Sequence, residues 1–234
     1  ATKLLGSKFE ARNRTGSAYF FSEEEISKFN YTNVDNLLGQ VPGVNVYQED
    51  GFGLRPNISL RGTSPERSSK ITIMEDGVLA APAPYSAPAA YYFPNVGRMQ
   101  NVEVLKGSSQ IQYGPFTTGG AMNFVSTEIP DEFNLNIRAR YGSYDSGNFY
   151  AKVGDSQENF GYMVEYNNIQ SDGFKDLPND NLDTGFDIND VVAKFRINTD
   201  ADAKVYQSLD FKFQYSDEIS NETYLGLTQQ DFEE

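Results

Sequence analysis

The sequence predicts an α+β domain over residues 1–130, followed over residues 131–234 by a run of antiparallel β-strands. Residues 58–126 hold short apolar strands separated by glycines, whereas apolar and polar residues alternate with a period of two after Asp131. The composition agrees, because 14% of the residues are aromatic although only 38% are hydrophobic. This combination favours amphipathic strands with one wet face over a disordered chain.

The first part of the chain predicts two short helices after an apolar strand at residues 18–21. Ser22 and Glu25 have the spacing of a capping box, in which the serine and glutamate side chains bind each other's backbone amides, so a helix is expected to begin after Ser22. A second helix begins at Thr32 or Asn33. It ends at Pro42-Gly43, and its apolar face is formed by Val34, Leu37, Leu38 and Val41.

The strands of the first domain lie between glycine-rich turns. Asp76-Gly77 is a hairpin signal, residues 49–56 form a glycine-rich loop, and the proline-rich residues 80–94 form a long irregular loop, which in compact domains is usually functional. The expected strands are residues 44–47, 57–61, 70–74, 101–106 and 121–126.

Residues 131–234 predict about five strands of roughly ten residues, the length that crosses a bilayer when tilted. One face is apolar and aromatic and the other carries charges; a soluble antiparallel sheet with one wet face would also alternate. Short turns at residues 155–159 and 199–203 alternate with longer loops, which favours the first strands of a transmembrane antiparallel β-barrel. Five strands cannot close a barrel, so we expect the chain to be truncated.

Several classes of function are excluded or disfavoured by composition. The chain has no Cys and no His, which removes disulfides, thiolate zinc sites and every mechanism based on histidine. A net charge of -14 disfavours nucleic acid as a partner. No carboxylate pair or activated nucleophile stands out, and the acidic residues 172–190 lack the spacing of an EF-hand. We therefore expect no enzyme, no cofactor and no bound metal.

A series of motifs in residues 60–125 resembles the TonB-dependent outer-membrane receptors. It consists of Leu60-Arg61-Gly62, Asp76-Gly77, Glu103-Val104-Leu105-Lys106-Gly107, Tyr113-Gly114 and Gly119-Gly120-Ala121-Met122-Asn123-Phe124-Val125. The resemblance implies that residues 1–130 are a plug domain and that residues 131–234 begin a barrel of about 22 strands in the Gram-negative outer membrane. It also implies outer-membrane lipid and the TonB inner-membrane complex as partners, with a ferric chelate or siderophore as cargo.

Within this family the chain is similar to the ferric-citrate type, on Ala83-Pro84-Tyr85, Phe93-Pro94 and Gly97-Arg98-Met99. One departure speaks against citrate itself: Tyr85-Ser86-Ala87-Pro88-Ala89 stands where ferric-citrate receptors resemble Tyr-Gly-Gln-Pro-Gln. The cargo is therefore ferric citrate or another siderophore. The alternatives are a receptor of this class for an oligosaccharide or cobalamin, and a soluble β-rich adhesin or binding domain.

The candidate site residues fall into two groups. The basic run over residues 55–70 contains Arg55, Arg61, Arg67 and Lys70 and suits an anionic ferric chelate, and the tyrosines of the proline-rich loop suit a partly polar one. Contacts between plug and barrel would also explain both features. The predicted ligand-binding residues are Arg55, Arg67, Tyr85, Ser86, Tyr91 and Tyr92. Arg61 and Lys106 end two strands and are expected to lock the plug by pairing with acids of the barrel; Arg61 contacting ligand directly is the alternative.

Overall fold

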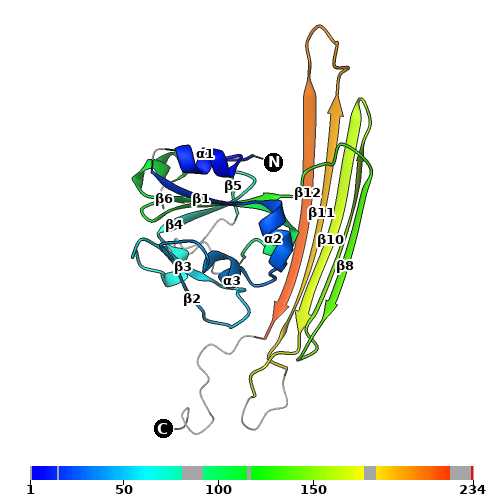
Figure 1. The fold of residues 1–234 in the computed structure, drawn as a ribbon. Helices are drawn as coiled ribbons and strands as arrows, with labels where there is room; N and C mark the ends of the chain where they lie inside the picture. The colour runs from blue at the N-terminus through cyan, green and yellow to red at the C-terminus, as the bar shows by residue number, and fades with distance from the viewer. Residues whose placement is uncertain are drawn as a thin grey trace. The chain divides into compact units, whose positions relative to one another are not determined.

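In the computed structural model the chain forms two compact units, unit 1 over Ala1–Thr127 and unit 2 over Glu128–Glu234 (Figure 1). The structure describes residues 2–14, 16–80, 92–114, 117–176, 183–221 and 233. Among these residues, no helix combines the length and the apolar character needed to cross a membrane.

Within the described part of unit 1 there are three short α-helices, each begun by a side-chain cap. Helix α1 (Lys8–Asn13), which the sequence did not predict, starts at Ser7. Helix α2 (Glu23–Phe29) has the predicted capping box, because Ser22 accepts from the Glu25 amide and Glu25 accepts from the Ser22 amide. Helix α3 (Val34–Leu38) is capped by Asn33, so both predicted helix starts are confirmed.

The main sheet of unit 1 has five strands in the order β1-β6-β7-β4-β5. Strands β4 and β7 pair in parallel and the other pairs are antiparallel. The strands are β1 (Ser17–Phe21), β4 (Ile71–Glu75), β5 (Val78–Leu79), β6 (Met99–Lys106) and β7 (Gly120–Ser126). Strands β2 (Val44–Tyr47) and β3 (Asn57–Leu60) form a separate two-stranded sheet. The 3₁₀ turns among the described residues of this unit are η1 (Glu66–Ser68), η3 (Val96–Arg98) and η4 (Ser108–Tyr113).

The turn between β4 and β5 has the expected chemistry. Asp76 and Gly77 both have positive φ, at 52° and 80°, as a type I′ hairpin turn requires. Strand β3 ends one residue earlier than predicted, because Arg61 already has a φ of 54°, which belongs to the left-handed region and not to a strand.

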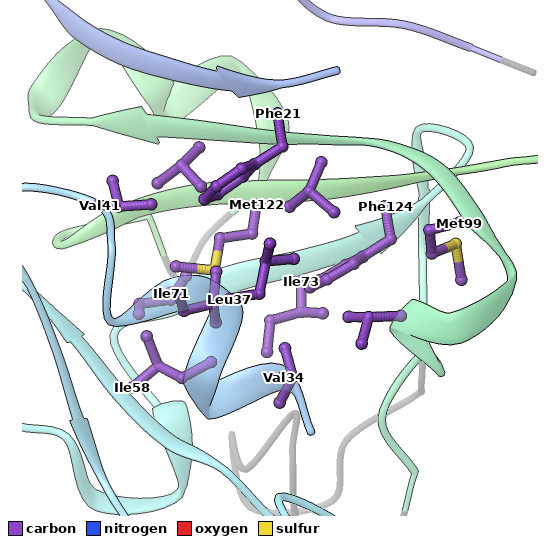
Figure 2. Packing of buried hydrophobic residues seen from close by; sticks show 14 of the residues in the cluster. Phe21, Val34, Leu37, Val41, Ile58, Ile71, Ile73, Met99, Met122 and Phe124 are labelled. Carbon is purple, nitrogen blue, oxygen red and sulfur yellow. The ribbon is translucent and has the colours of Figure 1, made fainter. Parts of the chain in front are cut away.

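The two faces of the main sheet carry different cores. One face packs against α2, α3 and the small sheet through a large apolar cluster that includes Phe21, Leu37, Ile73, Met122 and Phe124 (Figure 2). The opposite face holds a smaller cluster of Leu5, Ala11, Phe20 and Leu105. Because side chains alternate along a strand, Glu103 of β6 and its cross-strand partner Asn123 of β7 share this second face with Leu105.

Unit 2 is an antiparallel meander in the order β12-β11-β10-β9-β8. Its strands are β8 (Asn134–Tyr141), β9 (Gly147–Ser156), β10 (Phe160–Ser171), β11 (Phe186–Asn198) and β12 (Ser208–Ser220). The cross-strand register aligns Ile137, Ala151, Tyr166, Val191 and Tyr215 in one apolar row across all five strands. The neighbouring row on the other face is polar, with Arg138, Tyr150, Asn167, Asp190 and Ser216.

The apolar face of unit 2 is exposed to a degree that a soluble core would not allow. Among its large side chains, Val164 is 37% exposed, Ile137 is 61% exposed and Tyr141 is 78% exposed. Contiguous exposed apolar surface of this kind marks contact with a protein or a membrane.

Candidate functional site

Arg61 and Lys106 lie together at the ends of strands β3 and β6, as two neighbouring cations. The Lys106 ammonium donates to the Pro42 carbonyl oxygen at 2.6 Å. Burial, and then the nearby charge of Arg61, lower the pKa of Lys106. In the part of the chain that the structure describes, neither side chain forms an ion pair. Unit 1 thus brings together two like charges without a compensating carboxylate.

Two glycines of the sequence motifs allow close packing around this pair. A Cβ on Gly107, whose φ is 105°, would lie 2.9 Å from Nη1 of Arg61, so the glycine makes room for the guanidinium. A Cβ on Gly120, with a φ of 149°, would lie 2.1 Å from the Leu105 carbonyl oxygen, where no side chain fits. Steric requirements of unit 1 therefore explain Gly107 and the Gly-Gly motif, whereas Gly62 has open space around it and a φ of 78°.

Two adjacent acids at the start of the glycine-rich loop, Glu49 and Asp50, contact Arg67 and the backbone of Arg55. Arg67 lies 3.8 Å from a Glu49 carboxylate oxygen and its side chain remains 41% exposed. The Asp50 carboxylate accepts the Arg55 backbone amide at 2.9 Å. The positive charge of the basic run is thus partly balanced by Glu49, which precedes the run in the sequence. The ligand-binding roles of Arg55 and Arg67 stay predictions.

Tyr92 has its hydroxyl inside a buried ion-pair network. The Arg98 guanidinium makes two hydrogen bonds of 2.9 Å to the Glu75 carboxylate. The Tyr92 hydroxyl donates to Glu75 at 3.2 Å and accepts from Arg98 at 3.0 Å. The hydrogen-bond partners of Tyr92 are thus on β4 and η3, whereas the acids that contact Arg55 and Arg67 are on the glycine-rich loop. The other predicted loop residues, Tyr85, Ser86 and Tyr91, lie outside the described residues.

Comparison with known proteins identifies the first of these units. Residues 10–121 match the family of the TonB-dependent receptor plug domain. Residues 10–121 are a TonB-dependent receptor plug domain.

Solved structures extend this likeness beyond the plug domain. The unliganded ferric citrate transporter FecA is 22% identical, with a TM-score of 0.73 over 92% of this chain and 33% of its own. The ferric yersiniabactin receptor FyuA of Yersinia pestis is 23% identical, with a TM-score of 0.70 over 89% of this chain and 32% of its own. The siderophore receptor PirA of Acinetobacter baumannii is 17% identical, with a TM-score of 0.65 over 90% of this chain and 33% of its own.

These matches confirm the predicted fold, a plug domain followed by partial barrel strands, and the predicted resemblance to TonB-dependent receptors. The chain spans about a third of the length of the structures it matches.

The sequence did not single out two polar clusters inside the plug domain. Glu103, which is 0% exposed, accepts four hydrogen bonds on the face of the smaller core. Asp50, which is 9% exposed, accepts the amides of Phe52, Gly53 and Arg55 and so closes the glycine-rich loop. Glu103 had a detectable signal, since it is a charge within the otherwise apolar residues 102–105.

No group of three or more carboxylates is arranged to hold a metal ion among the described residues. The acidic residues of the β10–β11 connection that fall within the described ranges include Asp172 and Asp183. Both residues lie in the loop between these strands, and the candidate ligand-binding and locking residues are all in the plug domain.

Proposed function

We propose that this chain is part of an outer-membrane importer that takes up a ferric chelate, citrate or another siderophore, into Gram-negative bacteria. Residues 1–130 act as the plug, and residues 131–234 contribute strands whose exposed apolar row contacts outer-membrane lipid. The observation that carries the proposal is the plug-domain match over residues 10–121, followed along the chain by strands with a continuous apolar face.

The proposed mechanism is a rearrangement of the plug by energy from the TonB inner-membrane complex. The pull of the partner shifts the plug between a closed and a permissive state, and ligand binding biases the same equilibrium. Arg61 and Lys106 act as locks in the closed state. Lys106 is partly desolvated and lies beside the exposed Arg61, so carboxylates stabilise the pair, and acids on the barrel wall supply them.

Chelate binding is assigned to the outer loops of the plug. Arg55 and Arg67 attract an anionic complex by charge and by hydrogen bonds, and Tyr85, Ser86, Tyr91 and Tyr92 of the proline-rich loop are the other residues of the proposed binding site. The hydroxyl of Tyr92 already bonds Glu75 and Arg98, so Tyr92 contributes its ring face and holds its end of the loop in place.

Uptake of radiolabelled ferric chelates tests the proposal. A strain that lacks the whole gene is complemented with the native gene and offered a panel of ferric citrate and ferric siderophores, with cobalamin and an oligosaccharide as further cargoes. We expect uptake of at least one ferric chelate to depend on the gene and on the TonB complex. Full uptake of every ferric chelate without the gene overturns the proposal, and gene-dependent uptake of cobalamin or oligosaccharide alone reassigns the cargo.

A matched pair of variants tests the basic run. Arg67→Ala removes a half-exposed cation whose partner Glu49 belongs to the glycine-rich loop. Lys70→Ala removes an exposed cation three residues further along the chain. We expect Arg67→Ala to raise the chelate concentration for half-maximal uptake by about tenfold, the effect of one charge-assisted hydrogen bond, with Lys70→Ala near native. Equal effects of both variants would reduce the role of Arg67 to general charge.

A further inference from the structure

The N-terminal segment (residues 2–6) is attached to the plug by a single buried carboxylate. The backbone amides of Leu4, Leu5 and Gly6 donate to Glu103 at 2.7, 2.8 and 3.0 Å. Gly6 has a φ of 74°, and this left-handed turn helps three successive amides to converge on one anion. The Leu5 side chain, 3% exposed, enters the smaller core next to Phe20 and Leu105.

The N-terminal segment supplies most of the hydrogen-bond donors of the Glu103 carboxylate. Its carboxylate is 0% exposed, and a buried charge needs hydrogen bonds to offset its lost hydration. Three of its four hydrogen bonds come from the segment, and the fourth comes from Nδ2 of Asn123 at 2.8 Å. Removing the segment would leave the carboxylate buried with one donor.

Asn123 connects the same segment to the β4–β5 turn. Its Nδ2 also donates to the Thr2 carbonyl oxygen at 3.0 Å, and its Oδ1 accepts the Gly77 amide at 2.8 Å. A Cβ on Gly77 would lie 2.9 Å from the Thr2 side chain, so the turn and the segment also touch directly. One amide side chain therefore bonds the segment, the buried carboxylate and the turn.

We propose that Glu103 is a latch for the N-terminal segment and that Asn123 relays its state to the Asp76-Gly77 turn. Because the amides of Leu4, Leu5 and Gly6 bind one carboxylate, we expect all three hydrogen bonds to break together. Glu103 then loses three of its four donors, and the Asn123 side chain loses its contact with Thr2 and can move. The reverse holds by linkage, since a disturbance of the turn weakens the hold on the segment. The inference rests on the proposed function only for the source of the pull, a partner that draws on the N-terminal end of the plug.

Hydrogen exchange resolved to single amides, on the full chain in detergent, tests the latch without chelate or partner. Glu103→Gln keeps the shape but replaces one acceptor oxygen with a donor that faces the segment's amides. We expect protection of the Leu4, Leu5 and Gly6 amides to fall roughly ten- to a hundredfold, as loss of charge-assisted hydrogen bonds implies. The relay predicts that protection of the Gly77 amide also falls, although Glu103 does not bond it.

Asp50→Asn is the matched control, because Asp50 is also a buried carboxylate that accepts three backbone amides of unit 1. It should loosen the glycine-rich loop and leave residues 2–6 unchanged. Unaltered protection of residues 2–6 in Glu103→Gln, or an equal loss in Asp50→Asn, overturns the latch. A uniform loss over β6 and β7 overturns it as well, since Glu103 would then be a general core residue.

A second variant covers the case in which Glu103→Gln does not fold. Leu5→Ala retains every hydrogen bond and removes only the buried side chain of the segment. We expect a smaller loosening of residues 2–6 that the Gly77 amide follows. Unchanged Gly77 protection beside a loosened segment overturns the relay. Because no cargo or partner takes part, failure of these results and failure of transport are separate outcomes.

Discussion

Asp35 in helix α3 carries a charge that the folded plug domain does not accommodate well. The residue is 6% exposed, and its Oδ1 has no hydrogen-bond partner among the described residues. Burial, together with the negative charge of Asp50, raises the pKa of Asp35 from 3.8 to about 6. The folded state therefore binds a proton on Asp35 more tightly than the unfolded state does.

This difference makes the stability of unit 1 fall as the pH rises. The protonated carboxyl's contribution is fully present below pH 3.8 and is lost as the pH passes through about 6. A shift of about two pKa units corresponds to roughly 3 kcal/mol of unfolding free energy. Asp35→Asn has nearly the same shape and no charge, so it should stabilise unit 1 by up to about 3 kcal/mol at pH 8 and by little at pH 4.

Urea unfolding, followed by pulsed hydrogen exchange of peptides from β6 and β7, measures this effect in the full chain. With a urea dependence of about 1–3 kcal/mol per molar, a stabilisation of about 3 kcal/mol should raise the midpoint of Asp35→Asn by about 1–3 M at pH 8. Glu24→Gln, which neutralises an exposed acid of α2, should leave the midpoint within a few tenths of native. A variant no more stable than native at pH 8, or equally stabilised at pH 4, refutes the reasoning.

Three further changes test other parts of the plug domain. Ser22→Ala removes the cap of α2 and should cost about 1 kcal/mol, read as faster amide exchange in that helix. Gly120→Ala should prevent native folding of the main sheet, whereas Gly43→Ala, with a φ of 77° and open space around it, should cost only about 1–2 kcal/mol; equal urea midpoints would contradict the steric account. Arg98→Met should cost about 3–5 kcal/mol by stranding the buried Glu75, and adding Glu75→Met should recover much of that loss in urea titrations.

Local hydrogen bonds made parts of the fold predictable. The capping box joins Ser22 to a residue three positions away, and the Asp76-Gly77 turn needs only two residues with positive φ. The face on which each side chain of a strand lies was also predictable, since Val102 and Val104 alternate with Glu103 and Leu105 on opposite faces. Helix α1 was missed because its six residues carry little periodic signal.

The candidate site was predictable in its motifs and not in its partners. The basic-glycine strand ends marked Arg61 and Lys106, but their mutual proximity, and the Pro42 carbonyl that receives Lys106, come from strands far apart in the chain. The ion pair of Arg98 joins η3 to β4 across 23 residues, and no spacing rule indicates such a partner.

The sequence by itself determined the two-part organisation, the resemblance to TonB-dependent receptors and the alternation that makes one face of unit 2 apolar. These features depend on residues within a few positions of one another, where backbone geometry alone sets the pattern. Only the tertiary structure showed that Glu103 binds residues 2–6, because the amides of Leu4, Leu5 and Gly6 lie 97 to 99 residues away from it in the chain. A buried carboxylate takes its donors from whatever the fold brings to it, and that depends on sheet pairing and not on spacing.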